Sequence, residues 1–253
     1  MRRFLIQGDQ VRSGRARLVG PEAHHARHVL RLKTGDSLIL IDGQGSEYMA
    51  RIVSSGPEGL DLEILDRQPA LQESPLELTL GLALLKADRM DLVVQKGTEL
   101  GLKTLTPVRA ARCAVQLSPD RAAKRLERWR RVAGEAVKQC RRGEPVQVNP
   151  LTELPGFLSA SAGAELKVML YEGAAGGEAG DWRALLNITP RPRSVTALIG
   201  PEGGFTEAEV TLARKTGFDI LGLGPRILRS ETAALALMAI LGFELGDLVS
   251  ACP

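Results

Sequence analysis

Hydrophobic residues occur in short runs over the first 65 positions of the chain, and polar turn residues separate these runs. Turn signals such as Asp42-Gly43 and Thr34-Gly35-Asp36 lie between runs that are rich in Leu, Ile and Val. The pattern predicts strands over residues 3–6, 15–19, 37–41, 47–53 and 60–65. A helix is expected over residues 22–30. Short strands at this density are typical of a small β-barrel.

The pattern changes after a polar segment, residues 68–75, which contains two prolines and predicts a linker. From there strand-like runs alternate with helical periodicity. We expect strands over residues 76–85, 104–108, 166–171, 195–199 and 218–223. This alternation without hairpins indicates an α/β domain with a parallel, doubly wound sheet. The expected domains are therefore residues 1–70 and 75–253.

Two helices of this second domain are marked by their own periodicity. One is expected over residues 89–100, capped by Asp88. The other begins with Pro119 at its first position. Its core-facing residues recur at helical spacing: Ala122, Leu126, Trp129, Ala133, Ala136 and Cys140.

Two late strands each end in a glycine-bearing loop that opens into a helix. After the first loop, Thr206 and Glu209 form the pattern of a capping box. After the second, Ser230 is the expected N-cap, with Glu231 in the first turn. Ligands of open α/β sheets bind beside such loops, and glycines let backbone approach them closely. The alternative is that the glycines only form turns. A third strand end leads into residues 172–180, which are expected to be flexible.

The last helix, residues 232–243, carries no charge over three turns. A helix in a layered domain needs only one apolar stripe, so its second face needs cover. Either it is buried inside one subunit or it packs against the same helix of a second copy. We expect the second arrangement, a homodimer with the glycine-bearing loops near the subunit interface.

Composition excludes several classes of protein. The chain has 253 residues, of which 44% are hydrophobic and 25% charged, as in ordinary globular proteins. We expect no membrane span, no signal peptide and a cytoplasmic location. Cys113, Cys140 and Cys252 give neither a disulfide framework nor a CxxC pair, so reduced thiols are expected and structural zinc is unsupported.

Positive charge is concentrated in the middle of the chain. Residues 86–142 contain 15 Lys and Arg against 6 Asp and Glu, whereas residues 143–253 contain 8 against 13. Such a segment suits a polyanion-binding face, although a solvated helix surface has the same composition.

Three histidines lie on the predicted helix of the first domain. His24 and His28 are four residues apart and share a helix face, which metal sites also use. No Cys or carboxylate pattern completes a metal set, so no metal is expected. A structural histidine cluster and a contact with RNA, together with Arg27 and Arg31, are the other interpretations.

Several motifs resemble one known family. They are HHARHVLRLKTGD, KADRMDLVVQKGTELG, AVKQCRR, IGPEGGFTEAE and LGPRILRSETAALALMAI. Together they resemble the bacterial 16S ribosomal RNA uridine-N3 methyltransferases, which belong to the SPOUT class. The resemblance implies an N-terminal PUA-like β-barrel, a SPOUT domain with a trefoil knot, and S-adenosyl-L-methionine as cofactor. It also implies methylation of N3 of a uridine in 16S ribosomal RNA, with the assembled small subunit as the expected context.

The resemblance and the chemistry of small-molecule pockets assign the expected site residues. Expected cofactor-binding residues are Leu170, Tyr171, Glu172, Leu198, Gly200, Pro201, Glu202, Gly203, Gly204, Leu221, Leu223, Gly224, Ile227, Leu228 and Arg229. Expected RNA-binding residues are Arg27, Arg31, Arg121, Lys124, Arg125, Arg128 and Arg142.

The chemistry of uridine suggests the catalytic residues. Its N3 proton has a pKa of about 10, like that of a phenol, and must leave. A carboxylate acting as general base and an arginine holding the charge on the base oxygens would serve. The candidates are Arg229, Glu231 and Glu202. As alternatives, Glu231 serves the helix dipole, Arg229 is a structural link, and solvent hydroxide takes the proton.

Two other classes of protein are compatible with parts of the sequence. The GPEGG loop could bind a nucleotide phosphate at a helix start, but it lacks the Lys-Ser/Thr pair of a P-loop. The barrel and the basic helix could also bind RNA without catalysis.

Overall fold

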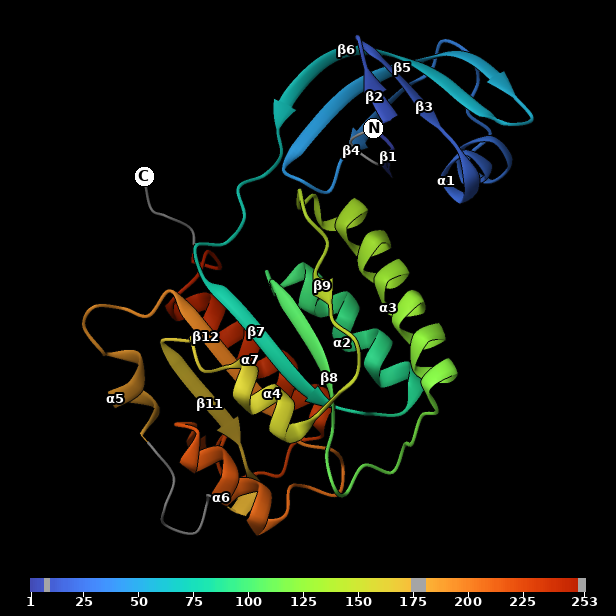
Figure 1. Ribbon diagram of the computed structural model, residues 1–253. Helices are drawn as coiled ribbons and strands as arrows, with labels where there is room; N and C mark the ends of the chain where they lie inside the picture. Colours follow the sequence, from blue (N-terminus) through green and yellow to red (C-terminus); the bar gives the residue numbers. More distant parts are fainter. Residues whose placement is uncertain (7–9, 174–180, 250–253) are drawn as a thin grey trace. The chain divides into compact units, whose positions relative to one another are not determined.

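The computed structural model describes residues 1–6, 10–173 and 181–249 (Figure 1). It divides into two compact units. The first contains Met1–Glu73 and Gly134–Pro145, and the second contains Ser74–Ala133 and Val146–Pro253. Most of the segment expected to be flexible, residues 174–180, and Cys252 lie outside the described residues.

The first unit is a six-stranded sheet with the order β1-β4-β5-β6-β3-β2. Its strands are β1 (Arg3–Leu5), β2 (Val11–Arg12), β3 (Arg15–Leu18), β4 (Ser37–Ile41), β5 (Ser46–Gly56) and β6 (Gly59–Pro69). All five predicted strands are present, and β2 is an addition. Neighbouring strands are antiparallel except β1 and β4, which are parallel. The two end strands, β1 and β2, are not paired with each other in the described part of this unit, so pairing does not close the expected barrel.

One hydrophobic core fills this unit. Alternate residues of the strands point into it, as the burial of Leu38 and Leu40 in β4 illustrates. The predicted helix is present as a short α-helix, α1 (Gly20–His24), that continues as a π-helical turn, η2 (His25–Val29). Ala23 and Ala26 of these turns are buried in the core.

The predicted linker over residues 68–75 is wrong in its first part. β6 continues to Pro69 because it stays paired with β5, and Leu71 forms a bridge with Arg142. The guanidinium of Arg142 is buried and donates a hydrogen bond of 2.8 Å from Nε to Glu73. The polar composition suggested an unstructured linker. Pairing with β5 and the contacts of Leu71 and Glu73 with Arg142 instead hold this segment in the first unit.

The second unit is built on a seven-stranded sheet with the order β10-β8-β7-β12-β11-β13, and β9 also pairs with β8. Its strands are β7 (Glu77–Ala83), β8 (Thr104–Arg109), β9 (Gln147–Val148), β10 (Thr152–Glu153), β11 (Leu166–Leu170), β12 (Ser194–Ile199) and β13 (Asp219–Leu221). All these pairs are parallel, as the alternation of strands and helices predicted.

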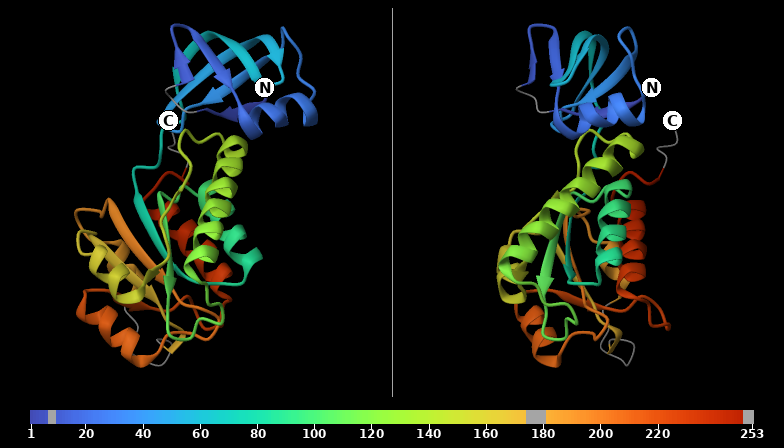
Figure 2. Two further views of the ribbon diagram at one scale, coloured as in Figure 1. Left: turned by 45° about the vertical axis from the view of Figure 1, so that its right-hand side comes forward. Right: turned by 90° about the vertical axis from the view of Figure 1, so that its right-hand side faces the viewer.

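Helices cover both faces of this sheet. They are α2 (Ala87–Glu99), α3 (Pro119–Cys140), α4 (Leu154–Ala160), α5 (Trp182–Leu186), α6 (Glu207–Lys215) and α7 (Ser230–Glu244). The side chains of α2 and α7 pack into one core, which Trp129 and Ala133 of α3 join. Those of α4 and α6 pack into the other core. The right-hand view of Figure 2 shows α2 and α7 on one side of the strands and α4 and α6 on the other.

Strand residues supply the two cores alternately. In β7, Leu78, Leu80 and Leu82 belong to the core of α2 and α7, and Ala83 belongs to that of α4 and α6. Gly81 faces Phe157 of α4 so closely that a β-carbon would lie 2.4 Å from the ring. Glycine is therefore needed where α4 packs directly on the sheet.

The helix starts agree with the sequence in two of four cases, one of which is α3, whose first residue is Pro119 as predicted. The capping box of α6 is confirmed, because Thr206 and Glu209 exchange both hydrogen bonds. The other two predictions are wrong by one or two residues. The N-cap of α7 is Arg229, which leaves Ser230 as the first helical residue, and the N-cap of α2 is Lys86, which leaves Asp88 in the first turn. Neither Arg229 nor Lys86 makes a side-chain capping bond.

Replacing Gly81 by alanine should destabilise the second unit, because its methyl group would overlap the ring of Phe157. We expect the free energy of unfolding to fall by about 1–3 kcal/mol. Urea denaturation followed by circular dichroism measures this change. Gly163→Ala is the matched control, since no atom lies within 4 Å of its β-carbon position. Equal midpoints for the two variants would contradict the tight contact.

Candidate functional site

Three neighbouring strands of the second unit end at the same level. In the register of the sheet, Leu170 of β11 lies between Ile199 of β12 and Leu221 of β13. The backbone N–H of Tyr171 donates a further hydrogen bond of 2.9 Å to the carbonyl of Leu221. Because the strands are parallel, their three following loops leave the sheet at one edge, where ligands of open α/β sheets bind.

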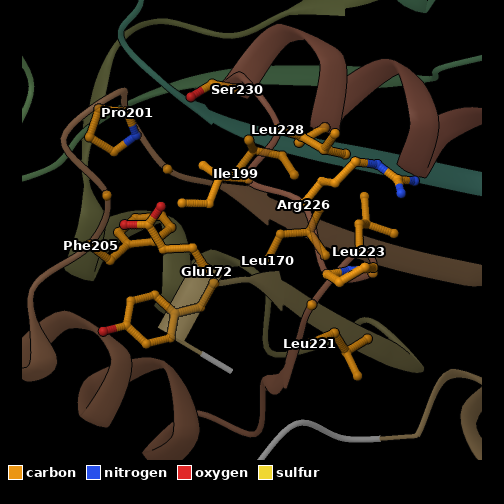
Figure 3. Close-up of a pocket in the computed structure, with 18 residues that line it drawn as sticks. Leu170, Glu172, Ile199, Pro201, Phe205, Leu221, Leu223, Arg226, Leu228 and Ser230 are labelled. Atoms are coloured by element: carbon orange, nitrogen blue, oxygen red, sulfur yellow. The ribbon is translucent and has the colours of Figure 1, made fainter. Parts of the chain in front are cut away.

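A pocket opens between these loops and the start of α7 (Figure 3). Its walls include most of the residues expected to bind a cofactor: Leu170, Tyr171, Glu172, Gly200, Pro201, Gly204, Leu221, Leu223, Gly224, Ile227 and Leu228. Sequence reasoning missed further lining residues: Ile199, Phe205, Gly222, Pro225, Arg226, Ser230 and Ala233. Their position in the two glycine-bearing motifs was the available signal.

Four expected cofactor residues do not line this pocket. Leu198 is fully buried in the core of α4 and α6, because it points to the opposite face from Ile199. Gly203 lies against Arg112, where a β-carbon would be 3.1 Å from that side chain. Glu202 lies beside the pocket in an ion pair, and Arg229 is exposed at the start of α7.

The glycine-bearing loops have the backbone that the site requires. Gly204 and Gly224 have φ angles of 69° and 74°, which favour glycine. A β-carbon at Gly200 would lie 2.9 Å from the ring of Phe205. Positive φ angles at Gly204 and Gly224 and the close packing at Gly200 account for glycine at these three positions.

The loop that contains Ala111 and Arg112 contacts the GPEGG loop and the start of α6. Arg112 donates hydrogen bonds to the carbonyls of Gly203 and Phe205, at 3.3 and 3.4 Å. Glu209 accepts a hydrogen bond of 2.8 Å from the backbone N–H of Ala111. Burial raises the pKa of the Cys113 thiol on this loop, so the thiol is a poor nucleophile at neutral pH.

Trp182 fixes the loop after β13. Its indole N–H donates a hydrogen bond of 2.7 Å to the carbonyl of Gly222, which lines the pocket. The two residues are 40 positions apart, and no local pattern joined them in the sequence.

Arg89 of α2 brings together two of the three expected catalytic residues. Its Nη1 donates a hydrogen bond of 2.8 Å to Glu202, and its Nε lies 3.5 Å from a carboxylate oxygen of Glu231. The other oxygen of Glu231, Oε2, is buried and has no hydrogen-bond partner among the residues that the structure describes. Arg229 takes no part in this cluster.

The residues expected to bind RNA differ in how free their charges are. Arg121, Lys124 and Arg128 are exposed on α3, and Arg125 is half-buried. Arg128 donates a hydrogen bond of 2.8 Å to Asp91, and this carboxylate raises the pKa of its guanidinium further. On the first unit, Arg31 is exposed, and Arg27 donates a weak hydrogen bond of 3.4 Å to Pro57.

Arg142 was expected on an RNA-binding surface. Its side chain is buried against Glu73, so its charge is paired within the first unit.

The rings of His24 and His28 lie 4.6 Å apart on α1 and η2. Within the described residues, no group of three or more His, Cys, Asp or Glu side chains could hold a metal ion.

Comparisons with known proteins identify the family. The RNA methyltransferase domain matches residues 72–242, and the RNA methyltransferase PUA domain matches residues 18–65. Ribosomal RNA small subunit methyltransferase E of Bacillus subtilis is 32% identical over 90% of this chain and 89% of its own length. The protein of the same name from Synechocystis is 31% identical over 94% of this chain and 76% of its own.

Solved structures agree with these relatives. Ribosomal RNA small subunit methyltransferase E of Neisseria gonorrhoeae, bound to S-adenosyl methionine, has a TM-score of 0.85 and 32% identity over 98% of this chain and 100% of its own. A Legionella pneumophila protein in complex with the cofactor SAM has a TM-score of 0.89 and 32% identity, over 97% and 98% of the two chains.

The matched domains define the class of RNA methyltransferases that carry an N-terminal PUA domain. Within that class, the chain belongs to the family of ribosomal RNA small subunit methyltransferase E. The resemblance recognised in the sequence motifs is thereby confirmed.

Proposed function

We propose that this protein transfers a methyl group from S-adenosyl-L-methionine to N3 of a uridine in 16S ribosomal RNA. The observation that carries the proposal is the pocket at the ends of β11, β12 and β13. It is formed by the two motifs that resemble the family, and the relative from Neisseria gonorrhoeae was solved with this cofactor.

The pocket suits the chemistry of the cofactor. Leu170, Ile199, Leu221 and Leu228 supply apolar walls for the flat adenine ring. Glycines 222 and 224 have open space where a β-carbon would be, so backbone N–H and C=O groups can reach the adenine edge. Nothing in this lining depends on a metal ion, and methyl transfer from a sulfonium needs none.

Catalysis then depends on alignment and on removal of one proton. The bound cofactor supplies a methyl group on a good leaving group, and the chain holds the uracil base in line with it. Glu231 and Glu202 are the candidate proton acceptors at N3, and Arg89 pairs with both of them next to the residues that line the pocket. Arg229 is exposed beside the pocket and would hold the charge on the base oxygens.

The remaining expectations for the site belong to the same proposal. The two glycine-bearing loops and α7 would form the trefoil knot of the SPOUT class. The substrate would be 16S ribosomal RNA in the small subunit, met in the cytoplasm. No helix in the described chain is long and apolar enough to cross a membrane.

The product is expected to be 3-methyluridine. Deleting the gene should remove this nucleoside from one position of 16S ribosomal RNA, and the wild-type gene should restore it. Arg229→Ala should fail to restore it, whereas Arg183→Ala, an exposed arginine of α5, should succeed. Mass spectrometry of mapped RNA fragments measures the nucleoside. Full retention of 3-methyluridine in the deletion strain would contradict the assignment.

RNA phosphates are the proposed partners of the exposed cations of α3. The double variant Arg121→Ala/Lys124→Ala should bind RNA more weakly, with a salt slope smaller by roughly 1.4–1.8, because each phosphate contact contributes about 0.7–0.9. Arg128→Ala is the comparison, and its slope should change less because Asp91 already pairs that charge. Titrations at several salt concentrations give the slopes. An unchanged slope in the double variant would show that this helix faces elsewhere.

A homodimer is proposed because α7 is not fully covered within one chain. Ala233, Ala234, Leu237, Met238 and Leu241 are buried. On the rest of the helix, Leu235, Ala236, Ala239 and Ile240 are half-buried and Phe243 is 57% exposed. A two-fold partner could pack the same surface against itself.

Light scattering at low micromolar concentration should give the mass of two chains. Ala236→Glu or Ala239→Glu should give one chain, since a charge would be buried in the interface without a partner. Ala160→Glu makes the same change at an exposed position of α4 and should leave the mass unchanged. A mass of one chain for the wild type would contradict the proposed homodimer.

A further inference from the structure

Arg89 of α2 contacts two of the chain segments that form the pocket. Its guanidinium donates from Nη1 to Glu202 at 2.8 Å, and its Nε lies 3.5 Å from Glu231. Glu202 lies in the GPEGG loop, and Glu231 lies 29 positions further along the chain, in the first turn of α7. The planar guanidinium of Arg89 thus links three segments that lie far apart in the sequence: the start of α2, the GPEGG loop and the start of α7.

The sheet explains how these segments meet. β7 and β12 are parallel neighbours, so their carboxyl ends lie at the same edge. The segment after β7 leads to Arg89, and the loop after β12 carries Glu202. Glu231 lies in the first turn of α7, directly after Ser230, which lines the pocket. The cluster is therefore next to the pocket on the side of β7.

Both carboxylates belong to chain segments that form pocket walls. Glu202 follows Pro201 and precedes Gly204, and both of these residues line the pocket. Glu231 is in the same turn of α7 as Ser230 and Ala233, which also line it. A change in the distance between the two carboxylates would accordingly move one wall relative to the other.

Removal of Arg89 would leave Glu202 and Glu231 without the cation that pairs with both of them. The side chains of Arg89, Glu202 and Glu231 are 30%, 29% and 12% exposed. Glu231 Oε2 already lacks a partner among the described residues, so this carboxylate depends on the guanidinium for its neutralisation. Arg17 of the first unit also pairs with two carboxylates, Glu58 and Asp61, but these side chains are 53%, 84% and 55% exposed, so this is a surface arrangement of the kind that contributes little.

We propose that Arg89 is a positioning residue that holds the GPEGG loop and the start of α7 at the spacing that the cofactor requires. This inference rests on the proposed function, because it assigns Arg89 a role in forming the S-adenosyl-L-methionine site. Arg89 does not line the pocket, so its effect on affinity passes through Glu202 and Glu231.

Isothermal titration of S-adenosyl-L-methionine into the purified full chain tests the inference. Arg89→Gln should raise the dissociation constant about tenfold, which corresponds to about 1.4 kcal/mol. Arg89→Lys keeps the charge but cannot reach both carboxylates with a planar fork, so its affinity should lie between those of Arg89→Gln and the wild type. Arg17→Gln, the same substitution in the exposed group with Glu58 and Asp61, should bind like the wild type.

A double-variant cycle separates positioning from independent contacts. Glu202→Gln should weaken binding several-fold, and in the Arg89→Gln background it should add little, because the link is already broken. If the fold-changes in the dissociation constant of the two single variants instead multiply in the double variant, the two residues act independently and the proposal is wrong. If Arg89→Gln is too unstable to titrate, Glu202→Gln and Arg89→Lys carry the test, and wild-type affinity in both would overturn it.

Stability is measured on the same variants, so that a general loss of fold is not mistaken for positioning. A lower melting temperature for Arg89→Gln with unchanged affinity would leave Arg89 a purely structural role and overturn the inference. Failure of the wild type itself to bind S-adenosyl-L-methionine would instead contradict the proposed function, which distinguishes the two failures.

Discussion

The register of three parallel strands is the constraint on which the site depends. Leu170, Ile199 and Leu221 form one row across β11, β12 and β13, so the chain must turn away from the sheet three times within a few ångströms. Those turns expose backbone at one edge, and their glycines allow it to pack closely. The apolar row forms the floor and wall of the pocket, while the loops form its rim. Fold and binding site thus follow from the same hydrogen-bond ladder.

Charge is distributed around this edge according to how much water reaches it. Arg121 and Lys124 are exposed on α3, and Arg128 of the same helix pairs with Asp91. Arg89, less exposed, instead neutralises two carboxylates of the pocket loops. The same residue type therefore occurs in two settings in one unit: on an exposed helix surface, where solvent screens its charge, and between two carboxylates, where less solvent reaches it.

The hydrophobic periods of strands and helices were sufficient to predict every long strand. They also predicted α2 and α3, the two helices of the basic segment. Residues 68–75 were mispredicted, because their polar composition suggested a linker while pairing with β5 extends β6 to Pro69. Arg142 was expected on an RNA-binding surface, yet Glu73, 69 positions away, holds it in the first unit. Both errors have one cause: a local pattern carries no information about a distant partner.

The sequence by itself determined the alternation of elements, the capping box of Thr206 and Glu209, and the two glycine-bearing loops that hold the pocket. Only the tertiary structure decided which side chains face it. Leu198 and Ile199 are equally apolar neighbours, but a strand turns successive residues to opposite faces, so only Ile199 reaches the pocket. Arg89 lies in one of the motifs that resemble the family, but its contact with Glu202, 113 positions away, and that of Trp182 with Gly222, 40 positions away, could not be predicted from a local pattern. Such contacts exist only once the sheet has brought its strand ends together.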